Sequence, residues 1–493
     1  MSDVQRNFIG GEWVASDTGE TFANVNPANT NDVIGHYQRS SRDDAKRAVA
    51  AAEAAFPEWR AMVAPERARI LGKAIRIAQD RTDELAKVMT REEGKPFKEA
   101  RGEILKGLNI LEYYVGEGWR IEGYTRPSEM RRTFTYTTRR PLGVVSLITP
   151  WNFPWAIPVW KTAPALIAGN TAVLKPSTLT PQTAIEWVRI LEEAGLPPGV
   201  LNFVTGPGST VGDELTNNPA IQAISFTGSN GVGQRLYQDA AARGIKVTCE
   251  MGGKNAVVVL RDGDLDQAVE GILQGAFGST GQRCTATSRA ILDRPIAEEV
   301  KARLVERARQ LKVGDGMDSA TQMGPAVDAS QLKTDLDYIQ IAKDEGARLL
   351  CGGRRLTEGA LADGYYVEPT IFDQVTAGMR LAKEEVFGPV LAILEADGYD
   401  EALRIANDVE FGLTASIYTR DSNLCLRFVD DAEVGMVHIN QPTIGGEAQL
   451  PFGGIKSTGV GDREMSIEGI NFFTEVKTVF FDYTGAKRET SIY

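Results

Sequence analysis

The stretch Val144-Val145-Ser146-Leu147-Ile148-Thr149-Pro150-Trp151-Asn152 begins the most regular pattern in this chain. Its apolar part, residues 144–148, reads as a buried strand. Four similar runs follow, at residues 171–174, 200–204, 223–226 and 246–249. Helical patterns separate the runs, notably over 182–193 and 233–242. Because strands that alternate with helices in this way form parallel sheets, residues 142–250 predict a doubly wound α/β sheet.

Small and polar residues follow these strands, where doubly wound sheets bind their ligands. Two glycine-rich segments, 206–212 and 228–233, each lie between a strand and a helix. Either segment alone fits a phosphate cradle or a plain turn equally well, but the two together favour a nucleotide site. Lys175 at a strand end adds a cation for a ribose or a phosphate, although a solvated surface lysine is nearly as common.

A second notable stretch is the loop 278–289, which contains Cys284 among glycine and hydroxyl residues. We expect backbone N–H groups and the adjacent Arg283 to favour the nucleophilic thiolate of an accessible Cys284. A carboxylate, Glu250, precedes a Gly-Gly turn earlier in the chain. The alternatives are that Cys284 is a small buried apolar residue and that Glu250 is a salt-bridge partner at a strand end.

Composition restricts the class of protein. A chain of 493 residues predicts two or three domains. The formal charge of −12 argues against nucleic-acid and anionic-membrane partners, and no apolar run approaches the roughly 20 residues of a membrane span. The amino-terminal residues lack the apolar core of a secretion signal. Four scattered cysteines without a CxxC pair predict a reducing, cytoplasmic location, and two histidines predict neither a metal site nor a Cys-His hydrolase.

The remaining patterns indicate a second α/β unit and an arm. Residues 256–260 read as a strand and 265–277 as the following helix. Residues 132–137 alternate with period two, and we interpret 122–140 as a hairpin arm that pairs with another chain. Residues 475–481 form a further predicted strand. The arm predicts a homodimer or homotetramer.

Seven motifs, taken in order, resemble those of the NAD(P)-dependent aldehyde dehydrogenase superfamily. They are residues 149–154, 175–177, 226–229, 250–253, 281–284, 384–389 and 451–454. The resemblance implies a Rossmann-like doubly wound cofactor domain, a second α/β catalytic domain and a β-hairpin oligomerisation arm. The implied division is 1–121 and 141–252 for the cofactor domain, 253–470 for the catalytic domain, and 122–140 with 471–493 for the arm.

The resemblance also implies a catalytic mechanism. Cys284 matches the nucleophile that attacks the aldehyde carbon, giving first a thiohemiacetal and then, after hydride transfer, a thioester. Asn152 matches the amide that, with the Cys284 backbone N–H, stabilises the oxyanion, a contribution of about 3–4 kcal/mol. Glu250 matches the base that activates water to hydrolyse the thioester, for which burial would raise its pKa towards neutrality. Glu464 matches a carboxylate behind that base.

The implied cofactor is NADP or NAD. The positions that match cofactor-binding residues or lie in the corresponding loops are Ile148, Thr149, Pro150, Trp151, Lys175, Ser177, Thr178, Gly208, Gly212, Phe226, Thr227, Gly228, Ser229, Gly252, Glu385 and Phe387. Many NAD-preferring members have a glutamate where this chain has Thr178, and that carboxylate repels a 2′-phosphate. Thr178 removes the repulsion and Lys175 can attract the phosphate, so we predict that NADP is accepted alongside NAD.

The implied substrate is a small aldehyde with a carboxylate at its far end, such as 2-oxoglutarate semialdehyde (2,5-dioxopentanoate) or succinate semialdehyde. Arginines that succinic-semialdehyde enzymes use are replaced here by Gly278 and Trp160. Arg283 is a candidate for binding the far carboxylate, although a role in orienting the loop fits equally well. Trp160 and Gln449 are the other substrate-binding candidates.

Several alternatives stay open at this point. One is the non-phosphorylating oxidation of glyceraldehyde 3-phosphate or another hydroxyaldehyde. A CoA-acylating relative would typically lack the Glu250 carboxylate, and a non-enzymatic structural protein would be expected to lose Cys284, Asn152 or Glu250. A cofactor-independent cysteine hydrolase would need a histidine close to Cys284.

Overall fold

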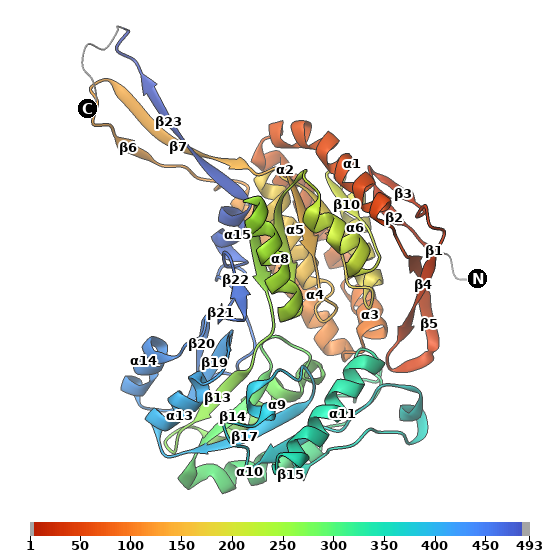
Figure 1. Ribbon diagram of the computed structural model, residues 1–493, viewed down its shortest axis with the longest axis vertical. Helices are drawn as coiled ribbons and strands as arrows, with labels where there is room; N and C mark the ends of the chain where they lie inside the picture. The colour runs from red at the N-terminus through yellow and green to blue at the C-terminus, as the bar shows by residue number, and fades with distance from the viewer. Residues whose placement is uncertain (1–3, 486–493) are drawn as a thin grey trace.

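The computed structural model describes residues 4–485. Residues 1–3, and residues 486–493 of the predicted arm segment, lie outside the described residues. Figure 1 shows two helix-covered sheets, one above the other in the view, and a slender arm that extends from the upper one. The predicted α/β fold class, with two α/β units and a β arm, is confirmed.

The larger sheet contains the five parallel strands predicted between residues 142 and 250. They are β8 (Val144–Ile148), β9 (Thr171–Lys175), β10 (Leu201–Phe203), β11 (Ile221–Thr227) and β12 (Lys246–Glu250). Their spatial order is β12-β11-β8-β9-β10, with parallel pairing throughout. The chain therefore builds outward from β8 on one side and then crosses to β11 on the other. This reversal places a ligand-binding crevice at the carboxyl ends of β8 and β11.

Short strands extend this sheet and form a small sheet beside it. The larger sheet gains β2 (Asn7–Ile9) and β3 (Glu12–Val14) at one edge and β22 (Gly459–Val460) at the other. The small sheet consists of β1 (Val4–Gln5), β4 (Thr21–Asn26) and β5 (Asn29–Gln38). The strand β22 comes from the predicted catalytic segment, so this segment returns to the first unit, and the exact domain boundaries stay predictions.

Helices cover both faces of the larger sheet (Figure 1). They are α1 (Arg42–Ala61), α2 (Ala64–Asp80), α3 (Thr82–Glu93), α4 (Phe97–Glu117), α5 (Ala156–Ala168), α6 (Pro181–Glu193), α7 (Asp213–Asn217), α8 (Asn230–Arg243) and α15 (Ser466–Phe472). All residues of α5 are buried, since this helix is apolar on nearly every side and lies between α4 and the sheet. The buried helix α5 begins four residues after Asn152 and so gives that segment a rigid support.

The second sheet is also mainly parallel. Its strands are β13 (Asn255–Val259), β14 (Thr287–Asp293), β16 (Thr370–Asp373), β17 (Val390–Ala396), β19 (Thr414–Tyr418), β20 (Met436–Ile439) and the antiparallel β15 (Arg348–Cys351). Its helices are α9 (Leu265–Phe277), α10 (Arg294–Arg309), α11 (Ala329–Asp344), α12 (Arg380–Lys383), α13 (Tyr399–Asn407) and α14 (Ser422–Asp431). The short strands β18 (Phe411–Gly412) and β21 (Ile455–Lys456) pair with each other. Cys284 lies in the turn that connects α9 to β14.

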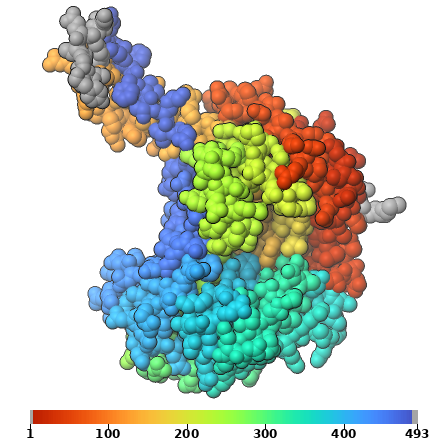
Figure 2. Space-filling model, viewed as in Figure 1, coloured from red at the N-terminus to blue at the C-terminus, as the bar shows by residue number. Residues whose placement is uncertain are grey.

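The arm joins two segments that are far apart in sequence. It consists of β6 (Thr125–Pro127), β7 (Thr133–Pro141) and β23 (Thr474–Asp482), with β7 in the middle. Figure 2 shows it extending away from the body of the molecule. Large apolar side chains on it are exposed, among them Phe134 at 50% and Phe480 at 67%. Within residues 4–485, no helix combines the length and the apolar character needed to cross a membrane.

Candidate active site

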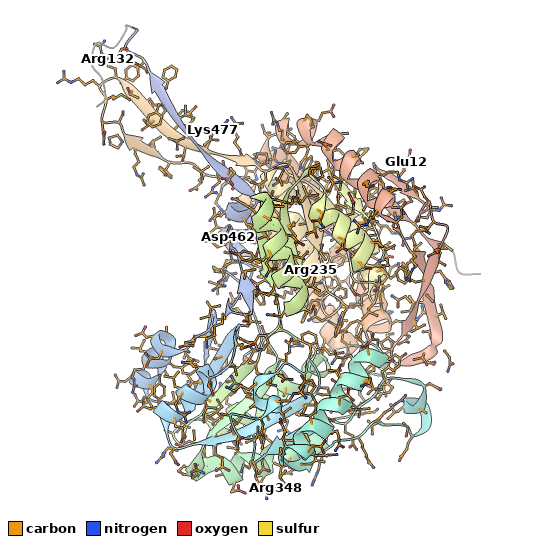
Figure 3. The ribbon with its side chains drawn as sticks, in the orientation of Figure 1. Glu12, Arg132, Arg235, Arg348, Asp462 and Lys477 are labelled. Carbon is orange, nitrogen blue, oxygen red and sulfur yellow. The ribbon has the colours of Figure 1, made fainter. Side chains whose placement is uncertain are left out.

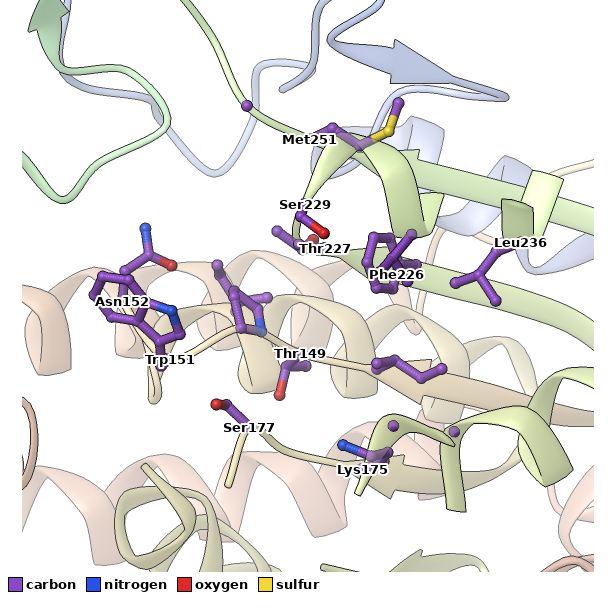
Figure 4. Close-up of a pocket in the computed structure, with 18 of the residues that line it drawn as sticks. Thr149, Trp151, Asn152, Lys175, Ser177, Phe226, Thr227, Ser229, Leu236 and Met251 are labelled. Atoms are coloured by element: carbon purple, nitrogen blue, oxygen red, sulfur yellow. The ribbon is translucent and has the colours of Figure 1, made fainter. Parts of the chain in front are cut away.

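A cavity of about 610 Å³ opens at the carboxyl ends of β8 and β11 (Figure 4). All the predicted cofactor residues from Ile148 to Phe387 line this cavity. Figure 4 shows Lys175 and Ser177 on one side of the cavity and Ser229 on the other. The structure thus brings together residues from six motifs at the point where the strand order reverses.

The chemistry of the cavity lining fits a dinucleotide. The hydroxyls of Thr149 and Thr227 are buried without a hydrogen-bond partner among the described residues, so they are available to ribose or phosphate oxygens. Burial lowers the pKa of Lys175 to about 8, and within residues 4–485 its Nζ donates only to the Pro176 carbonyl, at 3.1 Å. Burial raises the pKa of Glu385 to about 7, and Glu385 Oε1 accepts the Gly253 N–H at 2.8 Å.

Glycine is required where Glu385 approaches the backbone. A Cβ at position 252 would overlap the Glu385 carboxylate, so Gly252 lets this side chain enter the cavity beside the chain. Within the segment 206–212, residues Gly208–Gly212 form a π-helical turn in front of α7, and Gly208 has open space where a side chain would lie. Both observations match a site in which backbone and ligand come close together.

The same cavity contains two charged residues that sequence reasoning missed. Arg235 lies on α8 (Figure 3), and its Nη2 is 3.3 Å from Asp213 Oδ1. An arginine inside a helical pattern reads as a solvated side chain, so the sequence carried no signal for it. Its position on the same cavity wall as the glycine-rich turn could be found only from the fold.

Cys284 lies where this cavity meets a second one of about 400 Å³. Cys284 and Ile157 line both cavities. The backbone enters this turn through left-handed conformations at Ser279 and Thr280, with φ of 48° and 58°. Burial and the nearby carboxylates of Glu250 and Glu385 raise the pKa of the Cys284 thiol to about 12.

The expectation that Arg283 stabilises the thiolate is wrong. Its guanidinium points away to Ser279 Oγ, to which Nε and Nη2 donate at 3.1 and 2.9 Å, and it pairs with Glu99 at 3.5 Å. The cation that partly opposes the rise in the pKa of the Cys284 thiol is Lys106. Arg283 still lines the second cavity, and its polar contacts are with Ser279 of its own loop and with Glu99.

Asn152 is held beside Cys284 by contacts on two sides. Its Nδ2 donates to the backbone carbonyl of Gln282 at 3.0 Å, and the backbone carbonyl of Asn152 accepts from Lys95 Nζ at 2.6 Å. Lys95 also donates to Glu103 Oε2 at 2.7 Å. Glu103 Oε1 in turn accepts the backbone N–H groups of residues 155 and 156, at the start of α5, at 3.0 and 3.1 Å. Because a carboxamide has two N–H groups, Asn152 retains one for an oxyanion.

Two buried carboxylates lie close to each other behind the cysteine. Burial and the charge of Glu464 hold the pKa of Glu250 well above its usual value, and Glu250 Oε2 has no hydrogen-bond partner among the described residues. Glu464 accepts from Trp160 Nε1 and from Ser225 Oγ, each at 2.8 Å, and forms an ion pair with Lys161. Glu250 lines neither cavity, so its carboxylate must turn towards Cys284 in order to act on a bound group.

The second cavity contains two of the three predicted substrate residues, Arg283 and Trp160. The third, Gln449, is exposed, lines neither cavity and donates to the Glu447 carboxylate, so the structure does not support its assignment. The lining includes a lysine that sequence reasoning missed, Lys106 of α4. Within residues 4–485 there is no cluster of three or more His, Cys, Asp or Glu side chains that could hold a metal ion.

A doubly wound sheet, a dinucleotide-sized cavity at its strand reversal and a thiol at the inner end of that cavity define a nicotinamide-dependent oxidoreductase. The chain belongs to the aldehyde dehydrogenase family, whose sequence model matches residues 13–479. It is an NAD(P)-dependent enzyme that oxidises an aldehyde to a carboxylic acid.

Curated relatives and solved structures agree with this assignment. Alpha-ketoglutaric semialdehyde dehydrogenase of Bacillus subtilis is 48% identical over 474 residues, which are 96% of this chain and 97% of that protein. Alpha-ketoglutarate semialdehyde dehydrogenase of Haloferax volcanii is 47% identical over 484 residues, covering 98% and 100%.

Among the structures, an NADP dependent enzyme of E. coli superposes with a TM-score of 0.94 at 38% identity, covering 97% of this chain and 98% of that one. Betaine aldehyde dehydrogenase of Staphylococcus aureus in complex with NAD+ gives 0.95 at 33% identity, covering 98% and 95%.

Proposed function

We propose that this enzyme oxidises 2-oxoglutarate semialdehyde (2,5-dioxopentanoate) to the corresponding dicarboxylate, with NADP accepted alongside NAD. The observation that carries the proposal is the position of Cys284 between a dinucleotide-sized cavity and a second cavity lined by three cationic side chains. The two curated relatives are named for the same semialdehyde. Its far carboxylate suits a cavity in which the cations outnumber the carboxylates, whereas an uncharged aldehyde would bring no group to balance the remaining positive charge.

In the proposed mechanism, the Cys284 thiol releases its proton to water and its sulfur attacks the aldehyde carbon. A C–S bond forms as the carbonyl π bond breaks and its electron pair moves to the oxygen. The remaining Asn152 N–H and the Cys284 backbone N–H donate to the oxygen that becomes negative. The residues that line the first cavity, among them Lys175, Ser177 and Glu385, would hold the dinucleotide, which would supply the hydride acceptor for this carbon. The carbon then remains as a thioester on Cys284.

Hydrolysis of the thioester is assigned to Glu250. Its carboxylate takes a proton from a water molecule, and the resulting hydroxide displaces the Cys284 sulfur to give the acid. The raised pKa of Glu250 fits a base that works near neutral pH. Burial is the main cause of the raised pKa of Glu250, and the charge of Glu464, which is itself held by Trp160 and Lys161, raises it further.

We assign acceptance of NADP to the cavity wall around Thr178. A threonine there brings no negative charge towards a ribose 2′-phosphate, and Lys175 and Arg235 line the same cavity. The E. coli NADP dependent enzyme shares the fold. A substitution of Thr178 by glutamate would restore the repulsion that disfavours NADP.

The exposed apolar side chains of the arm support a homodimer or homotetramer in which the arm packs on another copy of the chain. The four free thiols fit a reducing compartment such as the cytosol. Sedimentation velocity measures the assembly, and a monomer at micromolar concentration would contradict the role of the arm.

The decisive experiment is a panel of aldehydes assayed with both cofactors. It contains 2,5-dioxopentanoate, succinate semialdehyde, glyceraldehyde 3-phosphate, and pentanal as the uncharged five-carbon control. We expect the highest kcat/KM for 2,5-dioxopentanoate, and no acyl-CoA when CoA is added. Faster turnover of pentanal or of the phosphate ester would refute the proposed substrate class, and the Cys284→Ala variant supplies the inactive control.

A further inference from the structure

The second cavity contains one cation that forms no ion pair with the residues that the structure describes. Its charged lining residues are Lys95, Lys106 and Arg283 against Glu99 and Glu103. Glu103 pairs with Lys95 at 2.7 Å and Glu99 pairs with Arg283 at 3.5 Å. Among the residues that the structure describes, Lys106 has neither an ion pair nor a hydrogen bond.

The ammonium of Lys106 is positioned by its surroundings and still open to the cavity. It lies 5.8 Å from the centre of the Trp160 ring, in the range of a cation–π contact. A Cβ on Gly446 would lie 3.6 Å from Lys106 Nζ, so the loop that follows β20 covers the ammonium from the other side. Trp160 is itself fixed through its bond to Glu464, at 2.8 Å.

We propose that Lys106 binds the far carboxylate of the semialdehyde while the aldehyde carbon lies at Cys284. This proposal rests on the proposed function and names the residue that selects the substrate. An ammonium that lacks a partner in a partly enclosed cavity has lost hydration, and a substrate carboxylate restores its missing charge-assisted hydrogen bonds. Burial lowers the pKa of Lys106, the expected direction for an ammonium whose partner arrives only with the ligand.

Arg283 is less suited to this role. Its guanidinium already donates twice to Ser279 Oγ and faces Glu99. A substrate carboxylate at Arg283 would meet the Glu99 carboxylate and would have to displace these contacts. Lys106 gives up nothing comparable, because its ammonium forms no hydrogen bond or ion pair with the residues that the structure describes and contacts the face of the Trp160 ring.

The test compares two aldehydes of the same length. For Lys106→Met, which keeps the apolar stem, we expect the ratio of kcat/KM for 2,5-dioxopentanoate over pentanal to fall about 10- to 100-fold, mainly through KM. The ratio cancels any general effect on the Cys284 thiol. Lys98→Met, on the exposed side of the same helix, is the matched control and should leave the ratio unchanged.

Two results would overturn the role of Lys106: an unchanged ratio in Lys106→Met, or an equal fall in Lys98→Met. In either case a wild-type enzyme that still prefers 2,5-dioxopentanoate would leave the proposed function intact. If the wild-type enzyme prefers pentanal, the proposed function itself fails.

A measurement on the unmodified enzyme does not depend on the folding of a variant. Glutarate is a five-carbon dicarboxylate without an aldehyde. Glutarate bound in the second cavity should slow the acylation of Lys106 by an amine-reactive reagent and leave the acylation of Lys98 unaffected. Peptide mass spectrometry measures the extent of acylation at each lysine. Equal labelling of Lys106 with and without glutarate would contradict the proposal.

Discussion

Replacing Lys95 by methionine removes the cation that holds the Asn152 backbone. Its Nζ is 2.6 Å from the Asn152 carbonyl and 2.7 Å from Glu103 Oε2. Hydrogen bonds to a charged group contribute about 1.5–3 kcal/mol each. Loss of one partner of a buried ion pair costs about 3–5 kcal/mol of stability. Since Glu103 keeps its two backbone N–H donors, we expect a cost at the lower end of that range, about 3 kcal/mol.

The effect on catalysis should act through Asn152. A displaced oxyanion donor loses part of the roughly 100- to 1,000-fold that such a group contributes to kcat, so we expect Lys95→Met to lower kcat about 10- to 100-fold. The assay is a double-mutant cycle with Asn152→Ala, combined with thermal unfolding. In the Asn152→Ala background, Lys95→Met should change kcat less than about threefold. An equally large loss of kcat in that background would refute a positioning role for Lys95, and Lys98→Met is the control.

Three further predictions concern charge and protonation. Glu464→Gln removes a negative charge near Glu250 and leaves Lys161 uncompensated, and both changes lower the pKa of Glu250. The acid limb of the kcat–pH profile should therefore move to lower pH. The control is Asp462→Asn, at an exposed position two residues away, which should leave the profile unchanged. Thr178→Glu should lower kcat/KM for NADP about 10- to 100-fold relative to NAD, and an unchanged ratio would contradict the assigned pocket. With a thiol pKa near 12, the rate of alkylation of Cys284 in the free enzyme should rise about tenfold per pH unit between about pH 7 and 9. A rate that levels off near neutral pH would contradict this expectation, because it would show that the thiolate has already formed.

The parts of the fold that depend on local pattern were predictable. The strand at residues 144–148 and the helix at 265–277 have the predicted limits, because a continuous apolar run and a clear 3.6-residue period respectively define them. The place of the cofactor cavity was also predictable, since the carboxyl ends of parallel strands meet at one edge of the sheet.

What the sequence could not predict depends on contacts between distant segments. Arg283 looked free to assist Cys284, but its partner Glu99 comes from a helix far earlier in the chain. Lys106 carried no signal because a lysine in a helix is usually solvated, and only the packing of α4 against the loop after β20 encloses it. Glu250 and Glu464 come together through the pairing of β12 with β22 and the short bridge between residues 452 and 464.

The meeting of the two cavities at Cys284 has a consequence for inhibition. Of the described residues, Ile157 and Cys284 alone line both cavities, so a molecule confined to the second cavity leaves the dinucleotide cavity open. Such a molecule will compete with the aldehyde and be noncompetitive against the dinucleotide. A single compound that fills both cavities must pass the Cys284 sulfur. If its two binding groups are joined by a linker that carries a weak electrophile at the sulfur, their separate affinities for the two cavities combine into one higher affinity.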